Sequence, residues 1–187
     1  MTALKALAVC GSLRKDSYNL KLLHTAQKIA REAGLTVSEA DLKALDLPVY
    51  NYDLEAAEFP GRVKETAEMV KSSDVLLLAS PEYNYSVSGA LKNAIDWVSR
   101  SKPNPFNGKV AAIFGASTGP FGTVRGQNQL RQILTTVNVL VLPQPQVFVP
   151  LADTAFEDDG TLKNKATEQQ LKDLLFKTFE FAEKMKR

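Results

Sequence analysis

The 187 residues contain only one cysteine and one histidine. Cys10 has no second cysteine with which to form an internal disulfide, and a free thiol suits the reducing environment of the cytoplasm. It ends an apolar run, where a buried, inert thiol is a better interpretation than a redox partner. His24 falls beside Leu20 and Leu23 in a predicted helix, so we interpret it as an ordinary helix residue rather than a catalytic base.

Long apolar runs and strong charge are also missing. No stretch approaches the ~20 apolar residues that a helix needs to cross a bilayer. The N-terminus lacks the longer apolar core and the cleavage site of a signal peptide. The net charge is +2, with a sequence pI near 8.6, and no clustered basic stripe is present. This balance is too weak to indicate nucleic-acid binding. We therefore expect a cytoplasmic protein with neither a membrane nor a nucleic acid as partner.

What is present is an ordinary globular composition, with 44% hydrophobic and 24% charged residues. A chain of this size suits one α/β domain and can bury more than half of the surface that it exposes when unfolded. It contains no internal repeat and no low-complexity tract. We predict a single domain over residues 1–187.

Apolar strand patterns alternate with helical patterns along the chain. Parallel strands need helical crossovers, so this alternation predicts a three-layer α/β fold in which helices cover both faces of a five-stranded parallel sheet. The predicted strands are residues 4–10, 36–42, 74–79, 109–115, and a last strand over 139–142 and 146–149 that is interrupted by Pro143 and Pro145. The predicted helices are residues 18–33, 61–72, 89–100 (with Ser88 as a plausible N-cap), 124–137 and 165–187, and residues 48–60 are interpreted as irregular loop.

Three loops follow the first, third and fourth strands, at the sheet edge where ligands of such folds bind. The first is GSLRKDSYN, residues 11–19, which opens a helix whose free N–H groups suit a phosphate. Ser12 and Ser17 can donate hydroxyl hydrogen bonds, Arg14 can bind phosphate oxygens, and Asn19 can orient the group or the loop. The loop has neither a G-x-G-x-x-G nor a Walker pattern, so it suits a phosphate monoester better than a pyrophosphate. A capped helix start with a solvated Arg and Lys explains the same residues about as well.

The second loop begins at SPEYNYSVS. Pro81 stiffens the turn after a buried strand, and Glu82, Tyr83, Asn84 and Tyr85 follow at the sheet edge. Two aromatic rings and an amide on a tight loop suit a flat heterocycle. Packing of the tyrosines between helices or subunits is an equally good interpretation of this loop alone.

The third loop is ASTGPFGTVRGQ, residues 116–127. Ser117, Thr118 and Gly119 can present hydroxyl and N–H groups to a second polar edge of a planar ligand. Gly119 and Gly122 allow the backbone to approach closely. An ordinary flexible loop is the alternative. Three loops of matching character at one edge favour a binding site more than any one of them does.

At GSLRKDSYN and PEYNYSVSGALKNAIDW the sequence resembles the NADPH-dependent FMN reductase family, which includes bacterial chromate and quinone reductases and flavin azoreductases. The resemblance runs from the first strand to the closing helix and implies a flavodoxin-like fold with strand order 2-1-3-4-5. It implies that FMN is held with its phosphate in the first loop and its isoalloxazine against the second and third loops. The cofactor-binding residues implied in this way are Ser12, Arg14, Ser17, Asn19, Leu20, Pro81, Glu82, Tyr83, Asn84, Tyr85, Ser117, Thr118 and Gly119.

The resemblance also implies an activity. NADPH or NADH would give hydride to the flavin and leave, and a small acceptor would then take the electrons: a quinone, an azo compound, free flavin or chromate. No protein nucleophile and no metal would be required. Arg100 would be a possible substrate contact, and the chain would form a homodimer or homotetramer. One alternative is a flavodoxin-type electron carrier, although a carrier would be expected to be acidic. Another is a non-redox nucleotide-binding or regulatory protein on the same fold, which the fold alone does not exclude.

Several residues have no ligand role in this interpretation. Glu82 is expected to make backbone contacts or a salt bridge to a neighbouring subunit rather than to act as an acid. Asp96 and Trp97 are expected to pack at the end of a buried helix. No role is assigned to Arg125 or Asn128.

Overall fold

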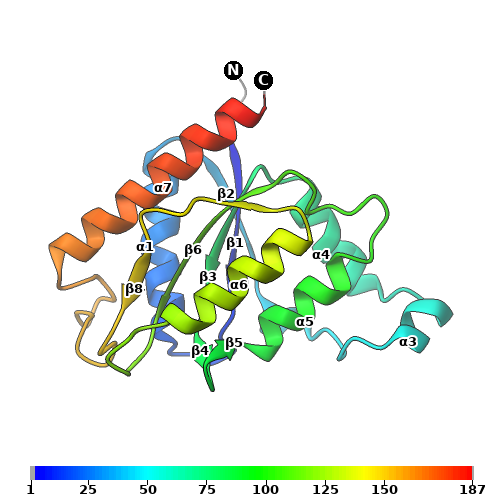
Figure 1. The fold of residues 1–187 in the computed structure, drawn as a ribbon, viewed down its shortest axis with the longest axis horizontal. Helices are drawn as coiled ribbons and strands as arrows, with labels where there is room; N and C mark the ends of the chain where they lie inside the picture. Colours follow the sequence, from blue (N-terminus) through cyan, green and yellow to red (C-terminus); the bar gives the residue numbers. More distant parts are fainter. Residues whose placement is uncertain (1–2, 187) are drawn as a thin grey trace.

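The computed structural model describes residues 3–186, and its centre is a six-stranded sheet with helices on both faces (Figure 1). The sheet runs in the order β2-β1-β3-β6-β7, and β8 also pairs with β6. Every pairing in this sheet is parallel. The strands are β1 (Lys5–Cys10), β2 (Thr36–Ala40), β3 (Val75–Ala79), β6 (Val110–Ala116), β7 (Leu140–Val141) and β8 (Val147–Val149). The predicted flavodoxin-like α/β fold and strand order are confirmed.

The last predicted strand is divided, as its prolines indicate. β7 pairs with Val110 and Ala111 at the start of β6, and β8 pairs with Phe114 to Ala116 at its end. Pro143 and Pro145 lie between the two pieces. Because proline has no N–H to donate, a continuous strand could not keep its ladder of hydrogen bonds there.

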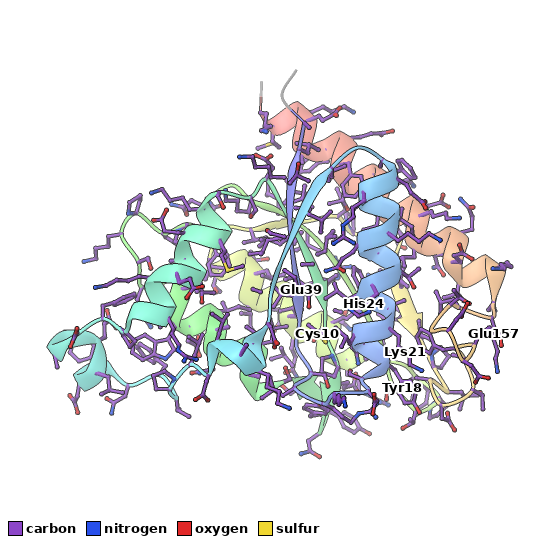
Figure 2. All side chains as sticks on the ribbon, turned by 180° about the vertical axis from the view of Figure 1, so that it is seen from behind. Cys10, Tyr18, Lys21, His24, Glu39 and Glu157 are labelled. Carbon is purple, nitrogen blue, oxygen red and sulfur yellow. The ribbon has the colours of Figure 1, made fainter. Side chains whose placement is uncertain are left out.

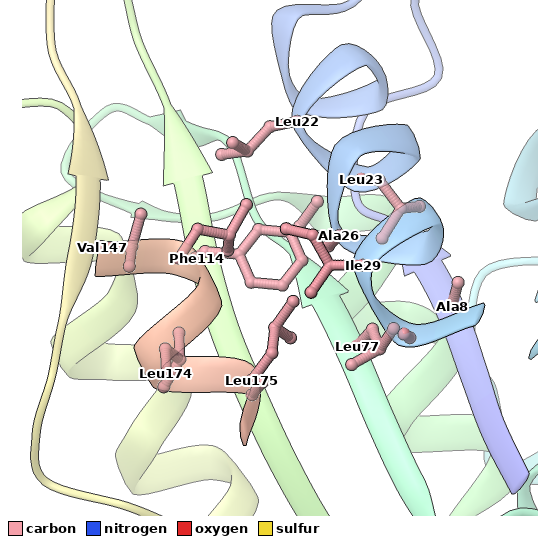
Figure 3. Close-up of a cluster of buried hydrophobic side chains, with 14 of the residues drawn as sticks. Ala8, Leu22, Leu23, Ala26, Ile29, Leu77, Phe114, Val147, Leu174 and Leu175 are labelled. Atoms are coloured by element: carbon pink, nitrogen blue, oxygen red, sulfur yellow. The ribbon is translucent and has the colours of Figure 1, made fainter. Parts of the chain in front are cut away.

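Two helices cover one face of the sheet and three cover the other. α1 (Tyr18–Glu32) and α7 (Lys165–Met185) share one apolar cluster with the sheet. α4 (Gly61–Lys71), α5 (Gly89–Val98) and α6 (Val124–Thr136) share the second cluster on the opposite face. In the first cluster Ala26 and Ile29 of α1 lie beside the fully buried ring of Phe114, with Leu175 of α7 on another side (Figure 3). β3 and β6 are buried along their whole length, which explains their uninterrupted apolar sequences.

Short elements account for the differences from the predicted boundaries. The region 48–60, which we interpreted as irregular loop, contains the helix α3 (Tyr52–Ala57), which begins at the N-cap Asn51 and has no buried residue. Strand β2 ends at Ala40 rather than residue 42, because the Asp41 side chain caps the short helix α2 (Leu42–Leu45). The second predicted loop contains an antiparallel hairpin, β4 (Glu82–Tyr83) and β5 (Ser86–Val87).

In the part of the chain that the structure describes, no helix is long and apolar enough to cross a membrane.

Candidate functional site

The loops after β1, β3 and β6 meet at one edge of the sheet and enclose a cleft of about 490 Å³. Figure 2 marks this edge by Cys10, the last residue of β1, and by Tyr18, the first residue of α1. The volume lies within the range of roughly 300–1,000 Å³ that is usual for small-molecule sites. The cleft is lined by Ser12, Arg14, Ser17, Tyr18, Asn19, Pro81, Glu82, Tyr83, Ala116, Ser117 and Thr118.

The first loop places a helix start and a cation at one end of the cleft. Ser17 is the N-cap of α1, and its hydroxyl accepts a hydrogen bond from Asn19 N at 3.2 Å. The guanidinium carbon of Arg14 lies 5.0 Å from the centre of the Tyr18 ring. The first turn of any α-helix leaves backbone N–H groups without intrahelical acceptors, and these attract anions. This end of the cleft therefore has the donors and the charge to hold a phosphate.

Asn19 joins the first loop to the third. Its amide group donates to Ala116 O and accepts from Ala116 N, each at 2.9 Å, and the side chain is buried. An amide that satisfies both backbone groups of one residue fixes the distance between the two segments. Asn19 therefore orients the loops, which is one of the two roles expected of it.

Cys10 lies directly below the first loop and is buried. Burial raises the pKa of its thiol above the ordinary value, although hydrogen bonds from the backbone of Ser12 and from Ser17 act in the opposite direction. A thiol whose pKa is raised stays protonated at neutral pH and is a poor nucleophile. This agrees with the interpretation of Cys10 as inert.

The second loop carries its tyrosines on the β4–β5 hairpin. Asn84 and Tyr85 form the tip and have φ angles of 49° and 67°, as the two central residues of a type I′ turn require. Tyr83 points back across the cleft, and its hydroxyl donates to Ser12 Oγ at 3.3 Å. The base of the loop is held by Ser88, whose hydroxyl donates to Gly11 O at 2.6 Å. The first two loops thus contact each other at two levels.

Glu82 holds the hairpin to α6. Its Oε2 accepts hydrogen bonds from the backbone N–H groups of Arg125 and Gly126, both at 2.9 Å, and its Oε1 lies 3.6 Å from the Arg125 guanidinium. The N-cap of α6, Thr123, makes no side-chain capping hydrogen bond. Glu82 therefore supplies from another element the acceptor that the helix start lacks. The expected backbone contacts are present, and the ion pair is formed within the same chain.

The third loop is bonded to the end of β8 and the segment after it on one side, and it borders the cleft on the other. Ser117 N donates to Val149 O, and Ala152 N donates to Ser117 O, at 3.0 and 3.1 Å. Gly122 has a φ of 59°, and a Cβ there would lie 3.0 Å from the Cβ of Phe148. Only glycine satisfies both demands. These contacts leave Ser117 and Thr118 lining the cleft.

The structure brings most of the predicted residues together in the cleft. The five exceptions are Arg100, which is described below, and four cofactor-binding candidates. Leu20 lines a neighbouring cavity of about 240 Å³, on the side of the first loop that faces β2. Asn84, Tyr85 and Gly119 do not line the cleft. Tyr85 is exposed at the hairpin tip, with the Arg125 guanidinium 4.1 Å from its ring centre.

Arg100 lies away from the cleft. It follows the end of α5, and its guanidinium is 5.0 Å from the centre of the Tyr50 ring. Because α5 begins beside the cleft at Gly89 and runs away from it, about 15 Å of helix separate Arg100 from the second loop. Its role as a substrate contact stays a prediction without support from this placement.

Two lining residues were not predicted. Tyr18 lies between Ser17 and Asn19 in the first loop motif and is the first residue of α1. The motif does not indicate which side of α1 faces the cleft. Ala116 has no polar side chain, and it contributes through its backbone and its bond to Asn19. Trp97 is fully buried, as expected. Asp96 does not pack in the core as expected: it is half-buried and forms an ion pair with Lys92 at 2.7 Å.

Known proteins resemble this chain in sequence. An NAD(P)H-dependent FMN reductase from Pseudomonas aeruginosa is 45% identical over 91% of this chain and 93% of its own length. A quinone reductase from Escherichia coli is 41% identical over 76% of each chain.

The structure of FerB, a flavoenzyme NAD(P)H:(acceptor) oxidoreductase from Paracoccus denitrificans, is 34% identical. It has a TM-score of 0.87 and covers 98% of this chain and 99% of its own. The model of NADPH-dependent FMN reductase matches residues 4–154, which include all three loops. The chain therefore belongs to the NADPH-dependent FMN reductase family and is an oxidoreductase that uses FMN and NAD(P)H.

Proposed function

We propose that this protein reduces small planar acceptors, quinones above all, with electrons from NAD(P)H, through FMN bound in the cleft between the three loops. The observation that carries this proposal is that one cleft brings together the Arg14 guanidinium, the start of α1, an aromatic ring and the hydroxyl groups of the third loop. The quinone reductase from Escherichia coli and the acceptor oxidoreductase from Paracoccus denitrificans support the class of acceptor. For azo compounds, free flavin and chromate the support is the resemblance of the loop motifs.

The cationic end fits the phosphate of FMN. The Ser12 and Ser17 hydroxyls, the Arg14 guanidinium and the first turn of α1 all border the same end of the cleft. A phosphate monoester needs several donors around one anion, and this donor set supplies them without a second phosphate site. Asn19 contributes by holding the helix start against β6, because its side chain is already engaged by Ala116.

The other end fits a flat ring system. Pro81 and Tyr83 provide apolar and aromatic surface on the second loop, and Ser117 and Thr118 provide polar groups on the third loop. Of the predicted second-loop residues, Glu82 would act by positioning the loop, and Asn84 and Tyr85 would act by shaping the hairpin. We propose the same indirect role for Gly119, whose N–H donates to Ser117 Oγ at 3.2 Å.

FMN, when bound, supplies the hydride chemistry, so the protein's task is to bind, orient and exclude competing reactions. We expect NAD(P)H and the acceptor to occupy the same open side of the cleft in turn. This order gives ping-pong kinetics.

Three further features belong to the proposal. The whole chain, residues 1–187, is one FMN-binding domain, and it works in the cytoplasm, where Cys10 stays reduced. It assembles as a homodimer or homotetramer. The support for self-association is the resemblance of the loop motifs to this family.

Steady-state kinetics test the function. We expect purified protein to bind one FMN, and to oxidise NADPH or NADH when a benzoquinone is the acceptor. Initial rates at several fixed quinone concentrations should give parallel lines in a double-reciprocal plot. Failure to bind FMN would contradict the proposal. Turnover only after a separate reductase is added would favour an electron carrier instead.

A further inference from the structure

Arg14 is held in the cleft by an aromatic ring rather than by an acid. Its guanidinium carbon lies 5.0 Å from the centre of the Tyr18 ring, within the range of a cation–π contact. Within residues 3–186, no carboxylate forms an ion pair with Arg14. The direction of this guanidinium therefore depends on where the Tyr18 ring lies.

The Tyr18 ring is in turn held by Phe156. The two ring centres are 6.0 Å apart and the planes are inclined by 9°, which is an offset stack. The Nζ atom of Lys21 lies 5.9 Å from the centre of the Tyr18 ring and 6.0 Å from the centre of the Phe156 ring, so the Lys21 side chain borders both rings. Figure 2 shows Tyr18 and Lys21 on the first turns of α1, with the loop that carries Glu157 beside them.

Phe156 is a fixed anchor rather than a loose loop residue. Its side chain is 7% exposed and belongs to the apolar cluster under α1 and α7. Its backbone pairs with Leu162 across a tight turn, and the N–H of Glu157 donates to Thr161 O at 2.8 Å. The match to the family model ends at residue 154, so this anchor lies beyond it.

We propose that Phe156 is a positioning residue for the phosphate site: it fixes the Tyr18 ring, and that ring directs the Arg14 guanidinium toward the phosphate of FMN. The inference rests on the proposed function, because it needs the phosphate to lie beside Arg14. Its consequence is specific. Loss of the stack weakens the binding of FMN and leaves the binding of riboflavin, which lacks the phosphate, unchanged.

The test compares the dissociation constants of FMN and riboflavin, measured on the apoprotein by quenching of flavin fluorescence. Phe156→Leu keeps an apolar side chain and removes the ring. We expect it to weaken FMN binding roughly twofold to tenfold, the size of one aromatic contact, with no change for riboflavin. Tyr18→Leu should also weaken FMN binding more than riboflavin binding, because it removes the ring that directs Arg14.

Two controls separate positioning from a general loss of structure. Phe106→Leu removes an equally buried ring, 5% exposed, from the cluster on the other face of the sheet. It should not change the ratio of the two affinities. In an Arg14→Ala background, Phe156→Leu should have no further effect on FMN, because the residue through which it acts is absent.

The outcomes are distinguishable. If Phe156→Leu weakens both flavins equally, or neither, the positioning role is wrong. If Phe156→Leu still weakens FMN in the Arg14→Ala background, the effect does not pass through Arg14 and the inference is also wrong. If Arg14→Ala itself leaves the ratio of FMN to riboflavin affinity unchanged, the phosphate does not lie at Arg14, and the proposed placement of FMN fails together with the inference.

Discussion

Asn19 is the residue on which the geometry of the cleft depends most directly. Asn19→Ala removes two hydrogen bonds of 2.9 Å and leaves the buried N–H and C=O of Ala116 without their side-chain partner. We expect the free energy of unfolding to fall by roughly 2–4 kcal/mol, since buried groups that lose a partner are costly. Urea denaturation followed by circular dichroism measures this loss.

A matched control for this prediction is Asn128→Ala. Asn128 is exposed on α6, so the same change of residue type there should alter the stability by less than about 0.5 kcal/mol. Equal effects of the two substitutions would show that the bridge from Asn19 to Ala116 contributes nothing measurable.

The residues that follow the end of a central strand could be predicted from sequence to line the cleft. Ser12, Arg14 and Ser17 lie in the cleft because they follow β1 within a few residues, and the edge of a parallel sheet fixes their place. Tyr18 could not be predicted, because its role depends on a ring that is far away in sequence, that of Phe156. Glu82 was ambiguous for the same reason, since its partners on α6 lie more than 40 residues further along the chain.

At the scale of elements, the hairpin β4–β5 and the helix α6 behave as one unit. Besides the contacts of Glu82, the Gln129 side chain donates to Tyr85 O at 3.0 Å and accepts from Ser86 Oγ at 2.5 Å. The hairpin is only two residues long in each strand, so it is too short to be stable alone. Its attachment to α6 is what keeps Tyr83 over the cleft.

Glu82→Ala should therefore loosen the hairpin. We expect the loss of the acceptor for two N–H groups of α6 to cost about 1–2 kcal/mol of stability, as the loss of an N-cap does. FMN and riboflavin should both bind more weakly, because the hairpin carries Tyr83, which lines the cleft. Thermal unfolding and fluorescence titration provide the two measurements.

Glu82→Gln is the informative comparison. Glutamine keeps an oxygen that can accept from the N–H groups of Arg125 and Gly126 but loses the ion pair with the Arg125 side chain, which is partly exposed and worth little. Its stability should fall by less than half as much as that of Glu82→Ala. A larger loss for glutamine would mean that the charge, and not the cap, holds the hairpin.

Long, buried elements were predictable, and short, exposed ones were not. β3 and β6 have continuous apolar sequences because both of their faces are covered. The helix α3 has no buried residue, so its six residues carry no apolar period that would reveal a helix. The β4–β5 hairpin needs a positive φ at Tyr85. The sequence does not predict this, because a tyrosine seldom adopts that conformation.

At the scale of the whole molecule, the three loops of the cleft emerge from the three adjacent central strands β1, β3 and β6. Each of these strands packs against both apolar clusters, so the loops are supported by the entire core. A ligand that contacts all three loops therefore binds only the folded state. By linkage, such a ligand raises the free energy of unfolding of the whole chain.

FMN should accordingly stabilise the protein against heat. At a free FMN concentration one hundred times the dissociation constant, the gain is about 2.7 kcal/mol. For a chain of this size that corresponds to a rise in Tm of roughly 5–10 °C, which differential scanning calorimetry of the apoprotein with and without FMN measures. Arg14→Ala at the same FMN concentration should show a smaller rise, because its affinity is lower, while its Tm without FMN should stay close to that of the unaltered protein, since Arg14 is exposed. An unchanged Tm at saturating FMN would contradict binding in a cleft built from all three loops.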